Sequence, residues 1–256
     1  MSKFLWRCTL LTLALPLTAR AEEALIAIAT NFAGVARHIE TEFEAVSSHR
    51  ITFVTGSTGK LFAQIVNGAP FDVLLAADQE RPRLLEEAGL AITGSRFTFA
   101  VGRLVVASRD AEMIGSGLRE TLSHPGASKL AIANPALAPY GLASKKILQN
   151  LDLWAGARHK VVMGENIGQT YALVATGNAD MGFVALSQVI GQRHAGLLTY
   201  VDVPERLHDP IRQDAVLLSH GQGNAAARDF LAFLASNNVQ MLVSASGYGS
   251  DTRFAD

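Results

Sequence analysis

Hydroxyl and carboxamide side chains stand at two points where an apolar, strand-like run of the sequence gives way to a helical pattern. The first point holds Thr30 and Asn31, and the second holds Ser57 and Thr58. The start of a helix exposes unpaired backbone N–H groups and about half a positive charge, so it attracts anions. The residue types at both points therefore indicate an anion-binding site made of neutral donors.

Two further helix starts have the same character. They lie in the segments 134–141 and 164–168, each of which combines small residues with an asparagine. In open α/β sheets the ligand crevice lies at the carboxyl ends of the strands, where these four junctions fall. The alternative is that the polar side chains only cap their helices, which contributes ~1 kcal/mol per helix. For any one junction both interpretations remain open, while the four together favour a shared site.

The sequence offers no arrangement typical of catalysis beside these donors. Gly59-Lys60 resembles the end of a phosphate-binding loop, but Leu61 occupies the place where that loop needs serine or threonine. No G-x-S-x-G segment marks a nucleophilic serine. His38 and Glu42 share a helix face, but one histidine among acids on a polar face is typical of a solvated surface, not of a metal site. The residues therefore favour binding over catalysis.

The segments around these junctions alternate between strand-like and helix-like patterns. We expect strands at 24–29, 50–55, 71–76, 104–107, 130–133 and 181–185. We expect helices at 32–46, 60–67, 79–89, 140–151, 167–176, 225–234 and 239–245. Alternating strands and helices predict an α/β fold whose parallel sheets are covered by helices on both faces.

Composition limits both the architecture and the partners. The 256 residues are 49% hydrophobic and 18% charged, and at ~150 residues per domain they suggest one large or two modest domains. The formal net charge of −1 provides no basic field, so nucleic acid is not expected as a partner. Cys8 is the only cysteine, which excludes a disulfide scaffold and a cysteine-based zinc site.

The N-terminus has the pattern of a secretory signal peptide, which we expect at 1–21. Lys3 and Arg7 precede a short apolar run at 8–17, and Ala19-Arg20-Ala21 has small residues at the two positions that signal peptidase reads. The apolar run is about half of the ~20 residues that span a bilayer, so we expect cleavage rather than stable membrane insertion. An exported, cysteine-free mature chain suits an oxidising compartment such as the periplasm.

Several short segments occur in an order that a known family shares. They lie at 29–32, 56–61, 63–65, 67–73, 76–78, 94–98, 134–143 and 182–186. By these motifs the chain resembles the periplasmic molybdate-binding proteins of ABC transporters, over essentially its whole mature length. The resemblance implies a two-lobed type II periplasmic binding-protein fold of the α/β class, in which each lobe is a mostly parallel sheet flanked by helices. One lobe would comprise 22–102 plus 206–256 and the other 103–205.

The resemblance also implies which residues bind the ligand. Carried over by position, they are Thr30, Asn31, Ser57, Thr58, Tyr140 and Ile167. Tyr140 stands where some members have alanine, and Ile167 stands where the backbone contacts the ligand. Ala185 departs from the pattern, because several members have tyrosine there, and Tyr140 would then bring a phenol from another loop. Molybdate would be bound as the intact oxyanion, so no cofactor and no side chain bound directly to a metal are expected.

Such a site would select among tetrahedral oxyanions by their protons. A fully deprotonated dianion has only acceptors, so N–H and O–H donors suit it. Hydrogen phosphate carries a proton that needs an acceptor, and a site without one leaves that proton unpaired. Asp78 and Glu165 are the acids nearest in sequence; we expect Asp78 to cap a helix and Glu165 to be solvated. Sulfate is also proton-free, so only the size of the cavity would separate it from molybdate.

The resemblance and the donors together predict high-affinity binding of molybdate and tungstate, with delivery to the membrane permease of an ABC transporter. We expect the two lobes to close on the anion, because the donors come from both. We also expect a monomer that is not an enzyme. Two alternatives remain open. One is a binding protein for sulfate or another tetrahedral oxyanion, and the other is an exported hydrolase or phosphotransfer enzyme that uses the helix starts as an oxyanion hole.

Overall fold

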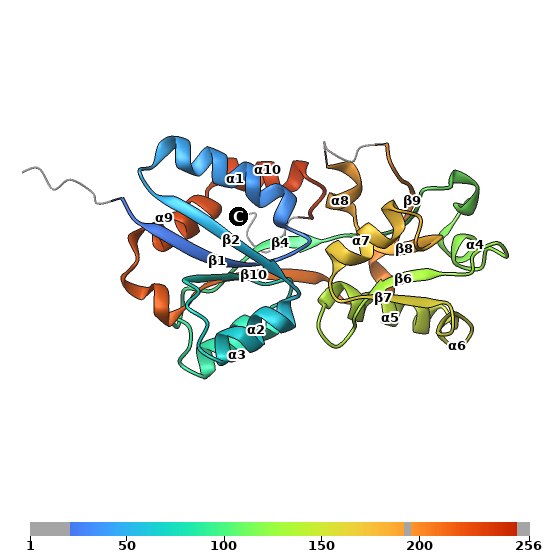
Figure 1. The fold of residues 1–256 in the computed structure, drawn as a ribbon, viewed down its shortest axis with the longest axis horizontal. Coiled ribbons are helices and arrows are strands. Elements are labelled where there is room, and N and C mark those ends of the chain that lie inside the picture. The colour runs from blue at the N-terminus through green and yellow to red at the C-terminus, as the bar shows by residue number, and fades with distance from the viewer. Residues whose placement is uncertain (1–20, 192–195, 250–256) are drawn as a thin grey trace, which may run out of the picture.

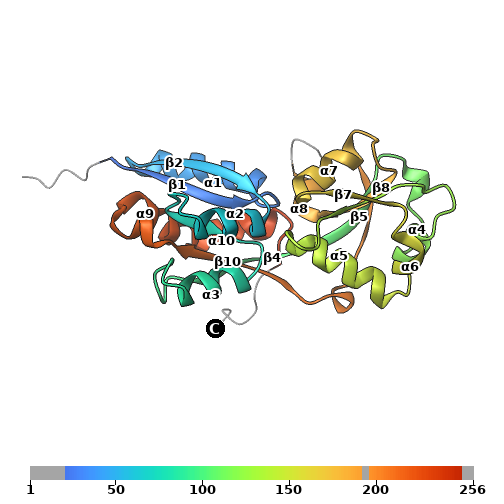
Figure 2. The ribbon, with the colours of Figure 1, turned by 60° about the horizontal axis from the view of Figure 1, so that its bottom comes forward.

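The protein forms two lobes joined by two crossings of the chain (Figure 1, Figure 2). The computed structural model describes residues 21–191 and 196–249. The signal peptide expected at 1–21 lies outside these residues, apart from Ala21. Within the described ranges, no helix is both long enough and apolar enough to span a membrane.

The first lobe is built on a five-stranded sheet with the strand order β2-β1-β3-β10-β4. The strands are β1 (Glu23–Ala29), β2 (Arg50–Gly56), β3 (Val73–Leu75), β4 (Phe97–Gly102) and β10 (Ile211–Leu217). The helices are α1 (Ala33–Val46), α2 (Thr58–Val66), α3 (Glu80–Glu87), α9 (Ala225–Leu234) and α10 (Asn237–Ala245). Helices α1, α9 and α10 cover one face of the sheet, and α2 and α3 cover the other (Figure 1).

The alternation of side chains along β1 explains these layers. Ile26 and Ile28 pack in the cluster that includes Phe230 of α9, whereas Ala27 packs in the cluster that includes Leu61 of α2. Successive side chains of a strand point to opposite faces of its sheet, so an uninterrupted apolar strand must be covered on both sides. The apolar run that predicts a buried strand therefore also predicts the two helical layers.

The second lobe is built on a five-stranded sheet with the strand order β7-β6-β8-β5-β9. The strands are β5 (Leu104–Ser108), β6 (Leu130–Ala133), β7 (Val161–Gly164), β8 (Met181–Ala185) and β9 (Thr199–Asp202). The helices are α4 (Leu118–Leu122), α5 (Pro139–Asn150), α6 (Trp154–Ala157), α7 (Ile167–Ala175) and α8 (Leu186–Ile190). Short 3₁₀ turns lie at η1 (Ala111–Met113), η2 (Glu205–Leu207) and η3 (Ser219–Gly223).

One strand in each sheet runs against the other four. These strands are β10 in the first lobe and β5 in the second. The chain leaves the first lobe along β4 and continues past Arg103 into β5, so β5 enters its sheet from the boundary between the lobes; β10 returns after 203–210 in the same way. The predicted α/β fold of two lobes is confirmed, but both sheets are mixed, because one strand of each enters from the boundary between the lobes and runs against the others.

Sequence patterns predicted the strands made of buried apolar residues better than the strands that are exposed or contain buried polar residues. The strand expected at 71–76 is shorter, since β3 has three residues. Strands β4, β7, β9 and β10 were not expected. Three of the four residues of β9 are exposed and one of them is an acid, so β9 lacks an apolar pattern, while β10 includes buried Gln213 and Asp214. Buried polar residues hide the apolar periodicity on which such predictions depend.

Candidate functional site

A small cavity lies between the two lobes, where helices α2, α5 and α7 begin. Its lining is Ala29, Thr30, Asn31, Gly56, Ser57, Thr58, Ala77, Ala138, Pro139, Tyr140, Asn166 and Ile167. The lining includes all six residues expected at the site. The cavity volume is about 10 Å³, close to the room that one water molecule needs, so an organic solute does not fit unless the lobes separate.

The hydrogen bonds decide between capping and a shared site at the first two junctions. No side chain caps α1, because its N-cap residue is Phe32, which follows Thr30 and Asn31. Ser57 occupies the N-cap position of α2, yet its side chain makes no capping hydrogen bond. The capping interpretation holds only at the fourth junction, where Asn166 Oδ1 accepts from the Gln169 N–H of α7 at 2.9 Å.

Ser57 and Thr58 present hydroxyl protons to the cavity. Ser57 Oγ is buried and has no hydrogen-bond partner in the part of the chain that the structure describes. Thr58 Oγ1 accepts from the backbone N–H of Ala77 at 3.0 Å, so its own proton remains available as a donor. The Thr30 hydroxyl donates instead to the Gly56 carbonyl at 3.2 Å, which ties the two junctions together.

The second lobe contributes the starts of α5 and α7 to the same cavity. Ile167 is the first residue of α7 and is buried, and its helix is capped by Asn166. Tyr140 follows Pro139, the first residue of α5. The first N–H groups of a helix have no partner within it, so these helix starts supply backbone donors opposite Ser57 and Thr58.

Tyr140 lines the cavity, and its phenol is held in a buried hydrogen-bond network. The side chain is buried, and its hydroxyl accepts from Gln213 Nε2 at 3.0 Å and from Asn31 Nδ2 at 3.5 Å. It also lies against Gly102 at the end of β4, where an added Cβ would come within 2.2 Å of the hydroxyl oxygen. Burial raises the pKa of the Tyr140 phenol well above its ordinary value, so this group stays neutral and can donate.

Three residues of this buried network were missed from the sequence. Gln213 Oε1 accepts from Asn31 Nδ2 at 2.8 Å. The Tyr248 hydroxyl donates to the Asn31 carbonyl at 2.8 Å, and it accepts from Ser187 Oγ at 3.1 Å. The one sequence signal was the pair Gln213-Asp214 directly before an apolar run at 215–217. Ala185, by contrast, ends β8 and is not among the residues that line the cavity.

Both acids nearest to the site are engaged with basic side chains. Asp78 Oδ1 accepts from the Arg81 N–H in the first turn of α3 at 3.0 Å, as expected for a cap, and Asp78 also pairs with the Arg81 guanidinium. Glu165 is partly exposed, and its Oε1 lies 2.9 Å from Lys60 Nζ in the other lobe. The fold therefore adds an ion pair between the lobes that the sequence did not indicate.

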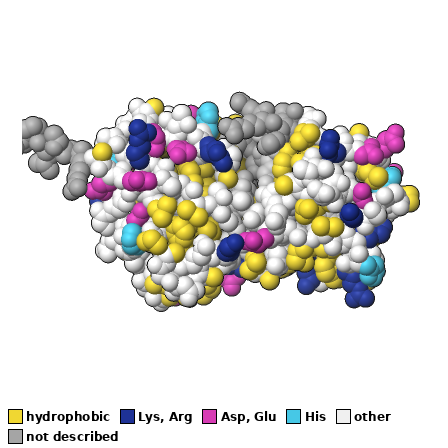
Figure 3. Space-filling model, viewed as in Figure 1, with side chains coloured by type: hydrophobic (Ala, Val, Ile, Leu, Met, Phe, Trp, Pro, Cys, Tyr) yellow, Lys and Arg dark blue, Asp and Glu magenta, His cyan; other side chains and the backbone are white. Residues whose placement is uncertain are grey.

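Contacts between the lobes border the cavity. The Gly59 N–H donates to the Leu137 carbonyl at 2.9 Å, beside the Lys60–Glu165 pair. Figure 3 shows the lobes in contact along their boundary on this face, with basic and acidic side chains there side by side. The first turn of α2 therefore both lines the cavity and touches the second lobe.

A larger cavity of about 270 Å³ lies nearby, on the side of Asp209 and Pro210. Charged side chains line it, and they include the ion pairs Asp78–Arg81 and Lys146–Asp209. Acidic and basic side chains are equally represented in this lining, so the space lacks the neutral donor set of the smaller cavity. Nowhere in residues 21–191 and 196–249 do three or more His, Cys, Asp or Glu side chains gather as a metal site would require.

The chain is similar to proteins of known class. Residues 24–249 match the family described as bacterial extracellular solute-binding protein. The molybdate-binding protein ModA of Rhodobacter capsulatus is 41% identical over 241 residues, which cover 93% of this chain and 92% of that protein. ModA of Azotobacter vinelandii is also 41% identical, over 231 residues that cover 90% and 91% of the two chains.

A solved structure agrees with these sequence relatives. The periplasmic molybdate-binding protein of Azotobacter vinelandii superposes with a TM-score of 0.85 and 33% identity, over 89% of this chain and 99% of that one. The match therefore spans both lobes and the cavity between them. The chain belongs to the bacterial extracellular solute-binding proteins and, within them, to the family of the ModA molybdate-binding proteins.

Proposed function

We propose that this protein binds molybdate, and tungstate in the same way, in the periplasm and delivers the anion to the permease of an ABC transporter. One observation carries the proposal: the residues that line the cavity between the lobes offer hydroxyls, amides and helix starts. The only ionisable side chain in this lining is the Tyr140 phenol, which stays neutral. The relatives named molybdate-binding proteins support the same ligand.

The physical match is between neutral donors and an anion that has only acceptors. Helices α2, α5 and α7 begin at the cavity, and each helix start carries about half a positive charge. Ser57 Oγ, orphaned within the described residues, and the proton of Thr58 complete the donor set. A dianion can replace the water that these groups bind in the open protein, without a buried lysine or arginine.

Selection against hydrogen phosphate follows from the absence of a carboxylate in the cavity lining. Glu165 and Asp78 are held by Lys60 and Arg81, and neither belongs to the lining. The proton of hydrogen phosphate would therefore find no charged acceptor in the lining, where only neutral oxygens can accept it.

The proposal also includes how the lobes move and how the protein reaches the periplasm. Lobes of residues 22–102 plus 206–256 and of residues 103–205 would open and close about the two crossings, and the closed monomer would dock on the permease. The signal peptide would direct export and would be cleaved after Ala21. No catalytic step is included, because the lining has no histidine, cysteine, lysine or acid to act as a general base.

Titration of the mature protein tests the proposal. Calorimetry should show submicromolar binding of molybdate and tungstate, and binding of hydrogen phosphate that is weaker by about tenfold or more. At a free concentration of a hundred times Kd, molybdate should raise the free energy of unfolding by ~2.7 kcal/mol. Absence of heat and of any thermal shift with both metal oxyanions would exclude the proposal.

Sulfate is the second candidate, because it is also proton-free and the neutral donors of the cavity lining suit it as they suit molybdate. The volume of about 10 Å³ is the room of one water molecule, so either dianion requires the lobes to separate slightly. Tight sulfate binding with weak molybdate binding in the same titration would identify a sulfate-binding protein. The reverse order would assign the site to molybdate.

A further inference from the structure

Within the described residues, the nitrogen of the Asn31 carboxamide is hydrogen-bonded and its oxygen is not. Its Nδ2 donates to Gln213 Oε1 at 2.8 Å, to the Tyr248 hydroxyl at 3.2 Å and, more weakly, to the Tyr140 hydroxyl at 3.5 Å. Its Oδ1 is buried and has no hydrogen-bond partner anywhere in residues 21–191 and 196–249. Because Asn31 lines the cavity and its Nδ2 is turned into this network, Oδ1 is the branch left for the cavity.

This orientation is unfavourable for a proton-free anion. An amide oxygen is an acceptor, and it would face ligand oxygens that can only accept. The same oxygen suits hydrogen phosphate, because it can accept a hydrogen bond from that ligand's proton. A donor in its place would instead form a charge-assisted hydrogen bond with a dianion, which is stronger than a neutral one. The orientation of one carboxamide therefore affects which class of oxyanion the site prefers.

Gln213 is coupled to that orientation, although it does not line the cavity. It is fully buried, and it accepts from Asn31 through Oε1 while its Nε2 donates to the Tyr140 hydroxyl at 3.0 Å. A half-turn of the Asn31 amide alone would bring Asn31 Oδ1 against Gln213 Oε1, two acceptors face to face. A half-turn of one amide therefore requires a half-turn of the other.

When both amides turn, every buried group in the network can keep a partner if the Tyr248 hydroxyl donates to Asn31 Oδ1, and Ser187 Oγ, 3.4 Å from the Asn31 carbonyl oxygen, donates to that carbonyl. Gln213 Nε2 then donates to Asn31 Oδ1, and the Tyr140 hydroxyl donates to Gln213 Oε1. Asn31 Nδ2 is released to donate into the cavity. The Tyr140 hydroxyl makes this possible because it can either donate or accept a hydrogen bond. Buried polar networks require such complete pairing.

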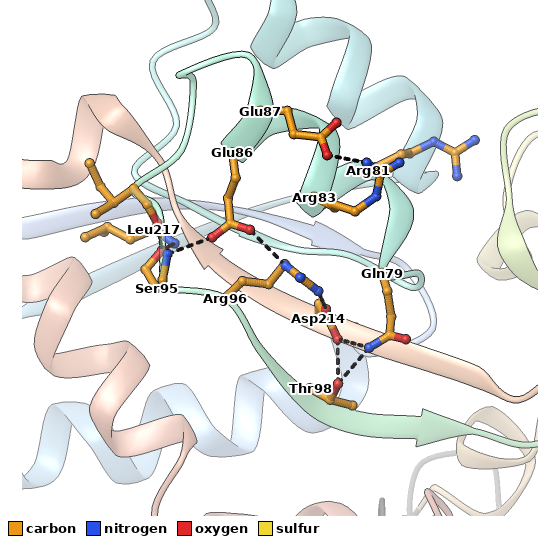
Figure 4. Close-up of polar contacts among 12 residues, drawn as sticks. Gln79, Arg81, Arg83, Glu86, Glu87, Ser95, Arg96, Thr98, Asp214 and Leu217 are labelled. Carbon is orange, nitrogen blue, oxygen red and sulfur yellow. Dashed lines mark hydrogen bonds and ion pairs between the residues drawn. The ribbon is translucent and has the colours of Figure 1, made fainter.

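The backbone of Gln213 is fixed, so the side chain is the part that turns. The pairing of β10 with β4 is irregular between Gln213 and Asp214, and such bulges re-aim side chains beside functional sites. Asp214, on the opposite face, accepts from Arg96 at 2.6 Å, from Thr98 at 2.7 Å and from Gln79 at 3.0 Å, as Figure 4 shows. These three hydrogen bonds fix the backbone of β10 next to Gln213.

We propose that Gln213 is a positioning residue that lets the site present a donor to a proton-free oxyanion, by turning together with Asn31 when the ligand binds. The inference rests on the proposed function, since it assumes that the cavity takes a tetrahedral oxyanion. Glutamine is suited to this role because its amide can hold Asn31 through either a donor or an acceptor.

The test compares Gln213→Glu with Gln213→Met at mildly alkaline pH, where molybdate and hydrogen phosphate both carry two negative charges. An ionised glutamate only accepts, so it holds Asn31 Nδ2 and the Tyr140 O–H and keeps Asn31 Oδ1 toward the cavity. Methionine has a similar length and no amide, so it leaves Asn31 able to turn either way. The measured quantity is the ratio of the Kd for hydrogen phosphate to the Kd for molybdate.

We expect the glutamate variant to lower this ratio by about tenfold or more, the worth of one hydrogen bond to a charged group, and the methionine variant to keep it within about threefold. Equal weakening of both anions in the glutamate variant would overturn the inference, because added charge alone acts on the two dianions alike. A methionine variant that loses as much selectivity as the glutamate variant would overturn it too. Failure of the unsubstituted protein to bind either molybdate or tungstate would instead overturn the proposed function.

Nuclear magnetic resonance gives a second readout that does not require the glutamate variant to fold. The side-chain NH₂ signals of Asn31 and Gln213 can be assigned through their loss in Asn31→Ser and Gln213→Met. Saturation with molybdate should shift both signals, although Gln213 does not line the cavity. A Gln213 signal that stays in place at saturation would contradict the coupled turn.

Discussion

Lys60 and Glu165 join the two lobes beside the cavity, with Lys60 Nζ 2.9 Å from Glu165 Oε1. Lys60 lies in the first turn of α2, and Glu165 precedes the residue that caps α7, so the pair links two of the helix starts at the site. The side chains are 53% and 40% exposed, and exposed pairs contribute at most ~1 kcal/mol. The pair therefore matters little for folding and forms only when the lobes meet.

Removal of either charge should weaken molybdate binding by about twofold to fivefold in Kd, mainly through faster dissociation. Lys60→Met and Glu165→Gln should have similar effects, and the double variant should lose no more than either single variant, because both remove one interaction. Stopped-flow dissociation and calorimetry measure this. Arg83→Met, which breaks a pair with Glu87 within α3, is the control and should leave the dissociation rate unchanged.

Gly59 limits how closely the lobes can approach. A Cβ at this position would lie 3.0 Å from the Leu137 carbonyl oxygen and 3.1 Å from the Leu137 Cα, both backbone atoms of the other lobe. Gly59→Ala should therefore hold the lobes apart and raise the Kd for molybdate by about tenfold or more, while the thermal unfolding of the ligand-free protein changes little.

Gly34→Ala is the matched control for this prediction. Gly34 lies in α1, and an added Cβ meets no atom within 4 Å. Alanine there should stabilise the helix by about 0.5–1 kcal/mol and leave affinity unchanged. An unchanged affinity in Gly59→Ala would mean that the lobes do not need this approach in order to bind.

The lining of the cavity could be predicted because its signals are local. Thr30, Ser57 and Thr58 each stand where a strand ends and a helix begins, and the sheet brings such junctions to one boundary. Local patterns also place the buried strands β1, β6 and β8. They could not show that the Thr30 hydroxyl bonds to the Gly56 carbonyl, since a strand end does not fix the direction of a side chain.

The network behind the lining depends on contacts between distant parts of the chain. Gln213 reaches Asn31 across 182 positions, and Tyr248 reaches it across 217. Glu165 pairs with Lys60 across 105 positions. No periodicity or motif encodes such a meeting, because it follows from the way in which β10 and the C-terminal segment return to the first lobe. Asn31 and Gln213 are also the residues on which our inference about selectivity depends.

The buried phenols should make the protein lose stability at high pH. Burial raises the pKa of both Tyr140 and Tyr248 above the ordinary value of ~10. In the unfolded chain both phenols ionise at ~pH 10, while the folded protein retains their protons. The stability that they contribute is complete below ~pH 10 and is lost as the pH rises further, by up to ~1.4 kcal/mol per pH unit for each group.

Urea unfolding at a series of pH values measures this loss. Tyr140→Phe and Tyr248→Phe should each flatten the decline above ~pH 10, because each removes one proton that only the unfolded chain releases. The same slope in both variants as in the unsubstituted protein would show that other groups cause the alkaline loss. Tyr200 is more than a third exposed, so Tyr200→Phe serves as the control and should not change the slope.

Substitutions of Ser57 and Thr58 should change the affinity for molybdate and the free energy of unfolding in different ways. Ser57 Oγ is buried and without a partner across the described residues, so Ser57→Ala removes a group that only a ligand or water can satisfy. We expect the free energy of unfolding to stay the same or to rise. The Kd for molybdate should increase about tenfold or more, which corresponds to the loss of a hydrogen bond to a charged group.

Thr58→Val should differ, because Thr58 Oγ1 also accepts from the Ala77 N–H at 3.0 Å. Valine keeps the shape of the side chain and leaves that buried N–H without its acceptor, which costs ~1–3 kcal/mol of stability. Affinity should fall as well, since the hydroxyl proton is lost. Denaturant unfolding and calorimetry measure both quantities in the two variants. Ser57→Ala should lower affinity while stability stays the same or rises, and Thr58→Val should lower both. A purely structural role cannot produce this pattern. Unchanged affinity in both variants would place the ligand elsewhere in the cleft.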